Sequence, residues 1–170
     1  SYFILVTTAG HDTTSASIAE GLNALVDDPA AMARLKAEPE LCASAADEFV
    51  RLAAPVKHFL RTPVRDLEIA GVSIKAGETI MLAYSSAARD ERHFSNPDGV
   101  TVDRPINQHL AFGYGPHVCL GKHLARMEIE VFFRRLLPRL AHIERAGPVH
   151  YTEAAFVSGI KKMPVRYRMT

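Results

Sequence analysis

The chain has 170 residues, of which 48% are hydrophobic, and its 20 Lys and Arg nearly balance its 19 Asp and Glu to give a formal net charge of +1. The length and the apolar content suit one domain, residues 1–170, with a sizeable core. The near-neutral charge excludes an electrostatic case for nucleic-acid binding, which calls for a basic stripe. Two distant cysteines, Cys42 and Cys119, do not form a disulfide framework, so reduced thiols in a cytoplasmic protein are expected.

The N-terminal third is expected to be helical. Residues 2–26 predict one long helix with a weak middle at residues 9–14, because Gly, Asp and Thr are mediocre helix formers. Asp28-Pro29 ends it and starts a second helix to about residue 37, since Pro suits the first helical position. Pro39 opens a third helix, which stops before Pro55.

The N-terminus itself carries two signals. The longest apolar run, residues 2–6, is much too short to span a bilayer, and no basic leader pattern occurs, so no membrane segment is expected. The sequence also enters an apolar helical segment at once, without a start methionine. We therefore expect a truncated or cleaved protein whose other part packs against this one.

After Pro55 the pattern changes. Residues 56–83 are rich in Val, Ile and Thr and predict short strands and turns, followed by a short helix at 84–89. Residues 91–110 show little periodicity, and a loop this long is usually functional. Leu120, Leu124, Met127 and Val131 recur at helical spacing and predict a helix that ends near Pro138. With strands in residues 141–170, the fold class is mainly α with small β-sheets, an α+β fold.

The stretch from Phe112 to Gly121 is the most informative in the chain. Cys119 stands at the start of the last predicted helix, where the helix dipole and free N–H groups stabilise a thiolate. Gly113 and Gly115 permit turns that other residues resist, and without side chains they let a flat group approach closely. Phe112 supplies an aromatic wall, Leu120 and Gly121 offer backbone N–H groups, and His117 is placed to meet an anion.

Three plainer interpretations of Cys119 stand beside this one. A lone cysteine is most often a buried structural residue. A zinc site lacks a second ligand at the required spacing. A Cys–His nucleophile is chemically sensible, because His117 and His123 lie near, but no third orienting group is apparent.

The pattern Phe-Gly-x-Gly-x-His-x-Cys-x-Gly at residues 112–121 resembles the haem-binding loop of the cytochrome P450 family in full. The resemblance implies haem b (iron protoporphyrin IX) as cofactor and the Cys119 thiolate as its metal ligand, which favours O–O cleavage. It further implies that His117 pairs with a haem propionate, within a cofactor-binding set of Phe112, Gly113, Gly115 and Gly121.

Residues 9–14, Ala-Gly-His-Asp-Thr-Thr, resemble the family's oxygen-activation motif. This implies that Ala9 and Gly10 belong to the cofactor site, that the Thr13 hydroxyl contacts oxygen, and that Asp12 relays protons. Without the other motifs, a simple helix break is the plainer interpretation.

Glu48 and Arg51 lie at i,i+3 on one predicted helix face, and such a pair is usually a surface ion pair. The family carries Glu-x-x-Arg here, locked to a second Arg from the loop before the cysteine. The resemblance therefore implies a structural role for Glu48 and Arg51, with Arg104 as the second Arg.

Two further groups rest on the resemblance. Arg61 is expected to bind a haem propionate, with surface exposure as the alternative. Substrate contacts are expected at Val56 and Phe59 and, in the late turn, at Phe156 and Val157.

Together these residues imply a haem-thiolate monooxygenase that hydroxylates a small apolar substrate with O2 and with electrons from NAD(P)H through a ferredoxin. The cationic residues Lys122, His123 and Arg126 form either a docking patch for that carrier or the solvated face of a helix. Complete family members are more than twice as long. The alternatives are a non-catalytic remnant that self-associates through its exposed first helix, and a Cys–His hydrolase.

Overall fold

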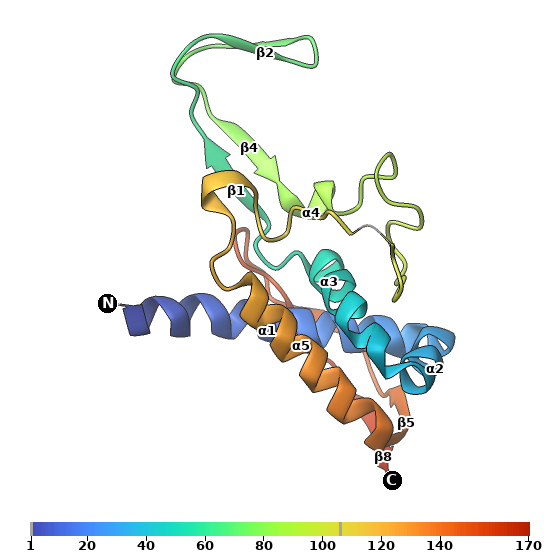
Figure 1. Ribbon diagram of the computed structural model, residues 1–170. Helices are drawn as coiled ribbons and strands as arrows, with labels where there is room; N and C mark the ends of the chain where they lie inside the picture. Colours follow the sequence, from blue (N-terminus) through green and yellow to red (C-terminus); the bar gives the residue numbers. More distant parts are fainter. Residues whose placement is uncertain (1, 106) are drawn as a thin grey trace.

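The computed structural model describes residues 2–105 and 107–170 (Figure 1). Its helices are α1 (Tyr2–Asp27), α2 (Pro29–Ala37), α3 (Cys42–Ala53), the short α4 (Tyr84–Ala87) and α5 (Lys122–Leu136). Single 3-10 turns occur at Pro39–Leu41, Gly115–His117 and Leu137–Arg139. The expected fold class, helices with small antiparallel sheets, is confirmed.

Proline and aspartate set the helix boundaries as the sequence predicts. The Asp28 side chain accepts a hydrogen bond from the Ala31 N–H at 2.9 Å and caps α2, whose first residue is Pro29. Helix α3 ends at Ala54 in the left-handed conformation, with φ of 33°, just before Pro55. Helix α1, in contrast, runs unbroken through residues 9–14, where a weak middle was expected.

Within the described residues, the strands form four two-stranded antiparallel sheets. Strand β1 (His58–Arg61) pairs with β4 (Ile80–Ala83), and between them β2 (Leu67–Ile69) and β3 (Val72–Ile74) form a hairpin. Near the C-terminus β5 (Leu140–Arg145) pairs with β8 (Val165–Met169), and β6 (His150–Tyr151) pairs with β7 (Ile160–Lys162). Figure 1 shows the β2–β3 hairpin projecting away from the helices, which cross one another on the opposite side of the molecule.

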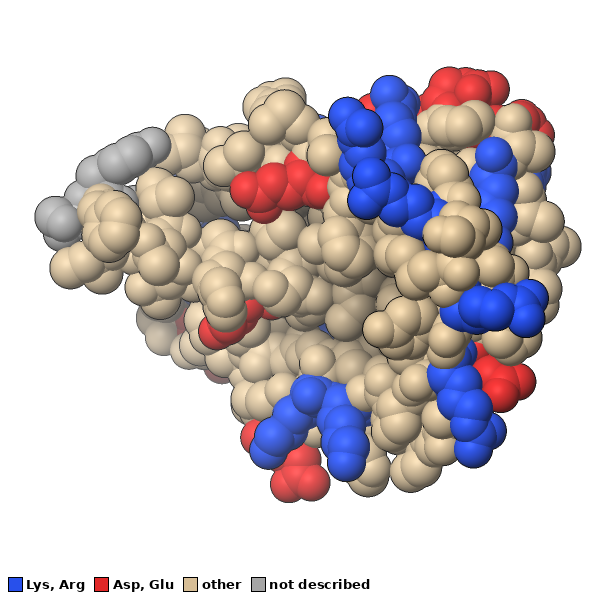
Figure 2. Space-filling view, turned by 90° about the horizontal axis from the view of Figure 1, so that it is seen from below, with Lys and Arg blue, Asp and Glu red and all other residues tan. Residues whose placement is uncertain are grey.

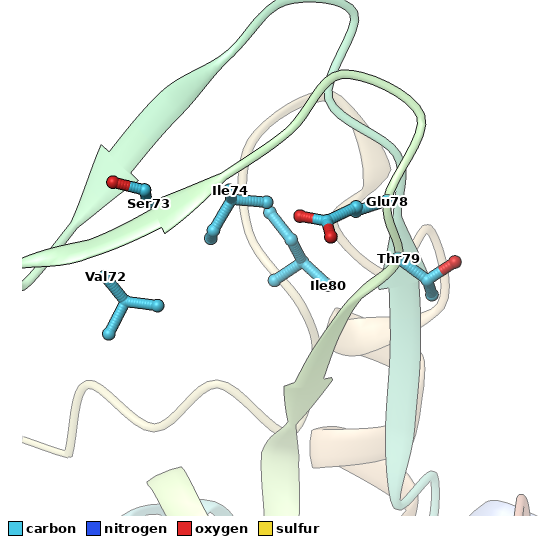
Figure 3. A pocket seen from close by; sticks show the side chains of 6 residues that line it. All are labelled: Val72, Ser73, Ile74, Glu78, Thr79 and Ile80. Carbon is cyan, nitrogen blue, oxygen red and sulfur yellow. The ribbon is translucent and has the colours of Figure 1, made fainter.

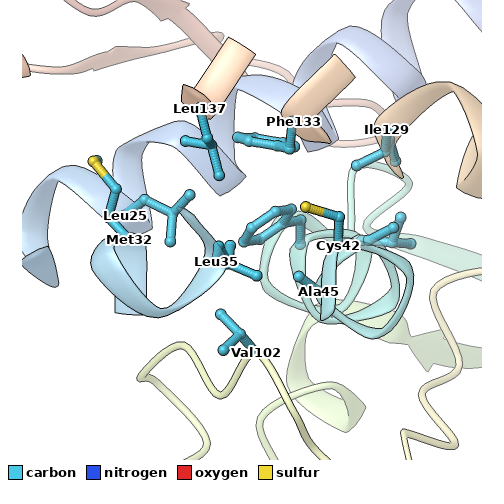
Figure 4. Close-up of a cluster of buried hydrophobic side chains, with 12 residues drawn as sticks. Leu25, Met32, Leu35, Cys42, Ala45, Val102, Ile129, Phe133 and Leu137 are labelled. Atoms are coloured by element: carbon cyan, nitrogen blue, oxygen red, sulfur yellow. The ribbon is translucent and has the colours of Figure 1, made fainter. Parts of the chain in front are cut away.

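The core lies where α1, α3 and α5 meet (Figure 4). Phe49 of α3 is fully buried and lies 4.6 Å from the ring of Phe133 of α5, centroid to centroid. Gly21 of α1 permits this packing, because a Cβ there would stand only 2.5 Å from the Phe49 ring. The remaining members of the cluster include Leu25, Met32, Leu35, Cys42, Ala45, Val102, Ile129 and Leu137.

The apolar stripe that predicted α5 is not the face that packs. Leu124, Met127 and Val131 are about half exposed, whereas Ile129 and Phe133 are fully buried against α1 and α3. Helical periodicity therefore located the helix correctly, but it did not identify the packed face. In the part of the chain that the structure describes, no helix is long and apolar enough to cross a membrane.

Candidate functional site

The cysteine loop, residues 110–121, has a defined backbone without regular strands. The Gly113 N–H donates to the Leu110 carbonyl at 2.8 Å, and the Cys119 N–H donates to the Phe112 carbonyl at 2.8 Å. Gly113 needs glycine for two reasons, since its φ is 72° and a Cβ would lie 3.3 Å from the His117 carbonyl oxygen. The loop thus returns on itself and presents Cys119 at its end.

Cys119 is exposed and lies just before the first turn of α5, which begins at Lys122 after Gly121 at the N-cap. Among the residues that the structure describes, no side chain caps this helix end. The Lys122 N–H donates to the Cys119 carbonyl at 3.4 Å, while the positive end of the helix dipole faces the thiol and favours a thiolate. The predicted position of Cys119 at a helix start is confirmed. The plain interpretation as a buried structural cysteine is wrong, whereas Cys42 is buried.

The surface around Cys119 fits a flat apolar cofactor. Leu120 and Tyr114 are more than four-fifths exposed, and Val118 is partly exposed. Exposed apolar side chains beside an accessible thiol favour a ligand that covers them together. The thiol can bind iron, and the surrounding side chains can pack on a porphyrin, so the residues present fit haem.

Glu48 is the anchor of the segment that leads to the cysteine loop. Its carboxylate is fully buried and accepts two hydrogen bonds from Arg51, at 2.8 Å each, and two from Arg104, at 2.9 and 3.0 Å. The Thr101 N–H and the Asn107 side-chain amide add bonds of 2.9 and 3.0 Å. Burial alone would raise the pKa of Glu48, but the bonds from the two arginines outweigh it and hold the pKa below its ordinary range.

The two arginines also donate hydrogen bonds to backbone carbonyls of the irregular segment, residues 88–99. Arg51 Nη1 donates to the carbonyls of Ala88 and Pro97, at 2.7 and 2.6 Å, and its Nη2 donates to Gly99 at 3.1 Å. The Arg51 guanidinium also lies over the Phe94 ring, 5.2 Å from its centroid. The plainer interpretation of Glu48 and Arg51 as a surface pair is therefore wrong, and Arg104 makes the expected contact with Glu48.

The residues of the oxygen-activation motif lie on one side of the exposed N-terminal half of α1. The Thr13 hydroxyl donates to the Ala9 carbonyl at 2.8 Å, which satisfies its proton within the helix. Asp12 is largely exposed, and its Oδ1 lies 2.9 Å from Nδ1 of the equally exposed His11. A Cβ on Gly10 would have no neighbour within 4 Å, so this side of α1 is open.

The four expected substrate residues, two from β1 and its approach and two from the late turn, are brought together. Val56 and Val157 form an isolated antiparallel bridge, and the Lys57 N–H donates to the Phe156 carbonyl at 2.8 Å. The rings of Phe59 and Phe156 meet edge to face with centroids 5.4 Å apart. An apolar surface assembled from segments about a hundred residues apart thus lies beside β1.

Arg61 ends β1 and is partly exposed, which leaves its guanidinium accessible. Its Nη1 donates to the carbonyl of the neighbouring Leu60 at 2.8 Å. His117 is exposed in the turn before Cys119. Among the described residues, no hydrogen bond joins Arg61 to His117, so their common role with propionates stays a prediction.

Sequence reasoning missed several residues around the site. Asp47, next to Glu48, accepts a hydrogen bond from Arg126 Nε at 2.7 Å and lies 3.4 Å from His109 Nε2. Arg126 is thus engaged in an ion pair, and it is not a free member of a cationic patch with Lys122 and His123. No local spacing signals these contacts, because Asp47 and Arg126 are 79 positions apart.

Two hollows of the surface lie elsewhere. One of about 550 Å³ opens between the β2–β3 hairpin and β4, where Ile74 and Ile80 line it with Val72, Ser73, Glu78 and Thr79 (Figure 3). A second, of about 300 Å³, lies between α2 and β5. Neither is lined by a candidate residue. Seen from below (Figure 2), Lys and Arg gather away from the end where α1, which contains neither residue type, begins.

Comparison with known proteins identifies the class that this fold and cysteine loop define. The family model for cytochrome P450 matches residues 3–165, so the chain belongs to the cytochrome P450 family, whose members use haem as cofactor. "Cytochrome P450-terp" from a Pseudomonas species is 46% identical over 166 residues, which cover 98% of this chain and 39% of that protein. A steroid C26-monooxygenase from Rhodococcus jostii is 38% identical and is covered to 35% of its length.

Solved structures give the same result. The crystal structure of CYP108D1 from Novosphingobium aromaticivorans superposes with a TM-score of 0.93 at 43% identity, over 99% of this chain and 41% of that one. P450BioI, solved with an acyl carrier protein bearing hexadec-9Z-enoic acid, gives a TM-score of 0.91 at 34% identity. The chain spans about two-fifths of the length of these relatives.

Proposed function

We propose that this chain is the haem-binding portion, a single domain, of a cytoplasmic haem-thiolate monooxygenase that hydroxylates a small apolar substrate. The observation that carries the proposal is Cys119, exposed at the uncapped start of α5 and held by the bond from its own N–H to the Phe112 carbonyl. A bound haem would supply the iron centre at which O2 is activated and one oxygen atom is passed to the substrate.

The cofactor would be held from two directions. The Cys119 thiolate would bind the iron, with Phe112 and the glycines 113, 115 and 121 shaping the loop under the porphyrin. Arg61 and His117 are both accessible and can both donate hydrogen bonds, which suits them to the two propionates. Ala9 and Gly10 would contribute to the cofactor site from α1, because small residues leave room on that side of the helix.

Asp12 and Thr13 would move protons within the cofactor site. The Thr13 hydroxyl donates its hydrogen bond to the Ala9 carbonyl. In this rotamer the Thr13 oxygen can accept a hydrogen bond from a ligand, but the hydroxyl cannot donate one to it. Rotation about χ1 would free the proton, and Asp12, exposed to solvent, would replace it. The acid and the alcohol thus form a two-step path from water to Thr13 Oγ1.

The substrate would contact Val56, Phe59, Phe156 and Val157. Their apolar character and the edge-to-face ring pair favour an aliphatic or terpenoid hydrocarbon over a charged molecule. We further propose that electrons come from NAD(P)H through a ferredoxin, with Lys122 and His123 on the exposed side of α5 near Cys119 as contacts for an acidic carrier.

The visible spectrum of the purified chain, loaded with haem, reduced and exposed to carbon monoxide, tests the proposal. We expect the strongly red-shifted Soret band of a thiolate-ligated haem, and we expect Cys119→Ser to abolish it. Cys42→Ala is the matched control, because Cys42 is buried in the core and should leave the band in place. Absence of haem absorbance after reconstitution would overturn the proposal for this chain and favour a non-catalytic remnant.

A further inference from the structure

A second carboxylate on α3 contacts the segments on both sides of Cys119. Asp47 binds Arg126 of α5 at 2.7 Å and lies 3.4 Å from His109, which precedes the cysteine loop. The His109 side chain is only 1% exposed, and those of Asp47 and Arg126 are 24% and 34% exposed. Three separate elements therefore meet at one carboxylate.

The hydrogen bonds fix which nitrogen of His109 carries the proton. The Ala111 N–H donates to His109 Nδ1 at 3.2 Å, so Nδ1 is an acceptor and carries no proton. In the neutral ring Nε2 must then carry it, and Nε2 is the atom that faces Asp47. His109 thus links the loop backbone at Ala111 to the carboxylate of Asp47.

Phe112 contacts both partners of Asp47. The Arg126 guanidinium stands over its ring, 5.1 Å from the centroid, and the His109 ring lies 5.5 Å away, centroid to centroid. The carbonyl of Phe112 accepts the Cys119 N–H at 2.8 Å. A continuous series of contacts therefore runs from Asp47 through Arg126 and His109 to Phe112 and then to Cys119.

We propose that Asp47, His109 and Arg126 are positioning residues that fix Phe112 and, through its carbonyl, the backbone of Cys119. The effect of these residues on haem ligation rests on the proposed function. Their effect on the conformation of the cysteine loop does not require a cofactor. Two hydrogen bonds outweigh the burial that would raise the pKa of Asp47, and its pKa is lowered, so the carboxylate stays ionised near neutral pH.

Arg126 differs in this respect from its neighbours on α5. Its charge is compensated by Asp47 and its face is covered by Phe112, so it contributes little field to a docking partner. Replacing Arg126 should disturb the loop, whereas replacing the exposed His123 should not.

Amide hydrogen exchange of the haem-free chain tests the conformational part. In Asp47→Ala we expect the amides of Cys119 and Ala111 to exchange about ten-fold faster or more, because their acceptors lose support. The Phe49 amide, inside α3, should change much less. Asp103→Ala is the matched control, since Asp103 forms an ion pair of similar length with Arg34, at 2.8 Å, away from the loop.

If Asp47→Ala destabilises the whole chain, a milder variant still distinguishes a local effect on the loop from global unfolding. Arg126→Lys retains the charge but loses the planar group over Phe112, and we expect it to accelerate the Cys119 amide without affecting Phe49. Equal acceleration of the Cys119 and Phe49 amides in both variants, or no change in either, would overturn the inference.

The haem-loaded chain supplies a separate measurement. With carbon monoxide, Asp47→Ala and Arg126→Lys should convert part of the red-shifted band into the band of haem that has lost its thiolate. A chain that takes up no haem contradicts the proposed function and leaves the exchange result to decide on the positioning residues.

Discussion

Replacing the buried carboxylate of Glu48 by its neutral isostere should be among the most damaging single changes in this chain. Glu48→Gln keeps the shape of the side chain but removes the negative charge that faces Arg51 and Arg104. Its amide would also direct N–H groups at guanidinium groups that can only donate. Two positive charges would then share a site that has little access to solvent.

The burial of these three side chains determines how much stability Glu48→Gln should lose. The side chains of Glu48 and Arg51 are 0% exposed and that of Arg104 is 5% exposed, so water cannot replace the lost partner. Breaking a buried ion pair by removing one partner costs about 3–5 kcal/mol. Against a typical domain stability of roughly 5–15 kcal/mol, this loss is a large fraction of the whole free energy of unfolding.

Urea unfolding followed by far-ultraviolet circular dichroism measures the effect. Asp103→Asn is the matched control, because it neutralises a carboxylate that pairs with Arg34 at 2.8 Å, with the two side chains 43% and 42% exposed to solvent. We expect a large fall in the urea midpoint for Glu48→Gln and no measurable fall for the control. Equal midpoints for the two variants would refute the reasoning, since the buried network would then contribute no more than a surface pair.

Two further predictions follow from burial and packing. Since the folded pKa of Glu48 is lowered from its ordinary value of 4.5, the stability that it contributes should be complete above that pH and should be lost as the pH falls through the folded pKa. Unfolding midpoints measured from neutral to acid pH check this, and a Glu48→Gln chain should show a flatter profile. Gly21→Ala should destabilise the chain by about 1–3 kcal/mol, because its Cβ would stand 2.5 Å from the Phe49 ring. Gly10→Ala, in open space on the same helix, should instead stabilise it by about 0.5–1 kcal/mol, and equal effects in a thermal melt would contradict the packing argument.

The element boundaries were predictable because local chemistry decides them. Asp28 and Pro29 separate α1 from α2 through a cap and a missing N–H, which depend on neighbouring residues alone. The packed face of α5 was not predictable. Leu124, Met127 and Val131 form an apolar stripe as regular as a core face, yet Ile129 and Phe133 make the contacts with α1 and α3. Only the placement of neighbouring helices decides between two apolar faces.

The residues of the candidate site also fall into those that local spacing predicts and those that only long-range contacts reveal. Glycine and cysteine spacing within ten residues located the cysteine loop, since positive φ at Gly113 is a local requirement. Arg104 was found through the family resemblance, because nothing in the spacing links it to Glu48. Asp47 and His109 carried no signal, since an aspartate on a helix is usually solvated and the contact spans 62 positions.

Adjacent positions on α3 explain how a long irregular segment holds one conformation. Asp47 and Glu48 point in different directions from the helix, so Glu48 holds the segment through Thr101 and Arg104 while Asp47 holds the later part through His109 and α5. Each residue fixed in such a segment costs about 1–2 kcal/mol in backbone entropy, without a strand ladder to offset it.

The buried carbonyls of this irregular segment also need hydrogen-bond donors, because no neighbouring strand supplies them. Arg51 alone serves three of them, those of Ala88, Pro97 and Gly99, while it binds Glu48. A lysine there has three donors at a single point and could not reach carbonyls spread along the chain while it also bound the carboxylate. The residue type at position 51 therefore follows from the backbone that it must satisfy.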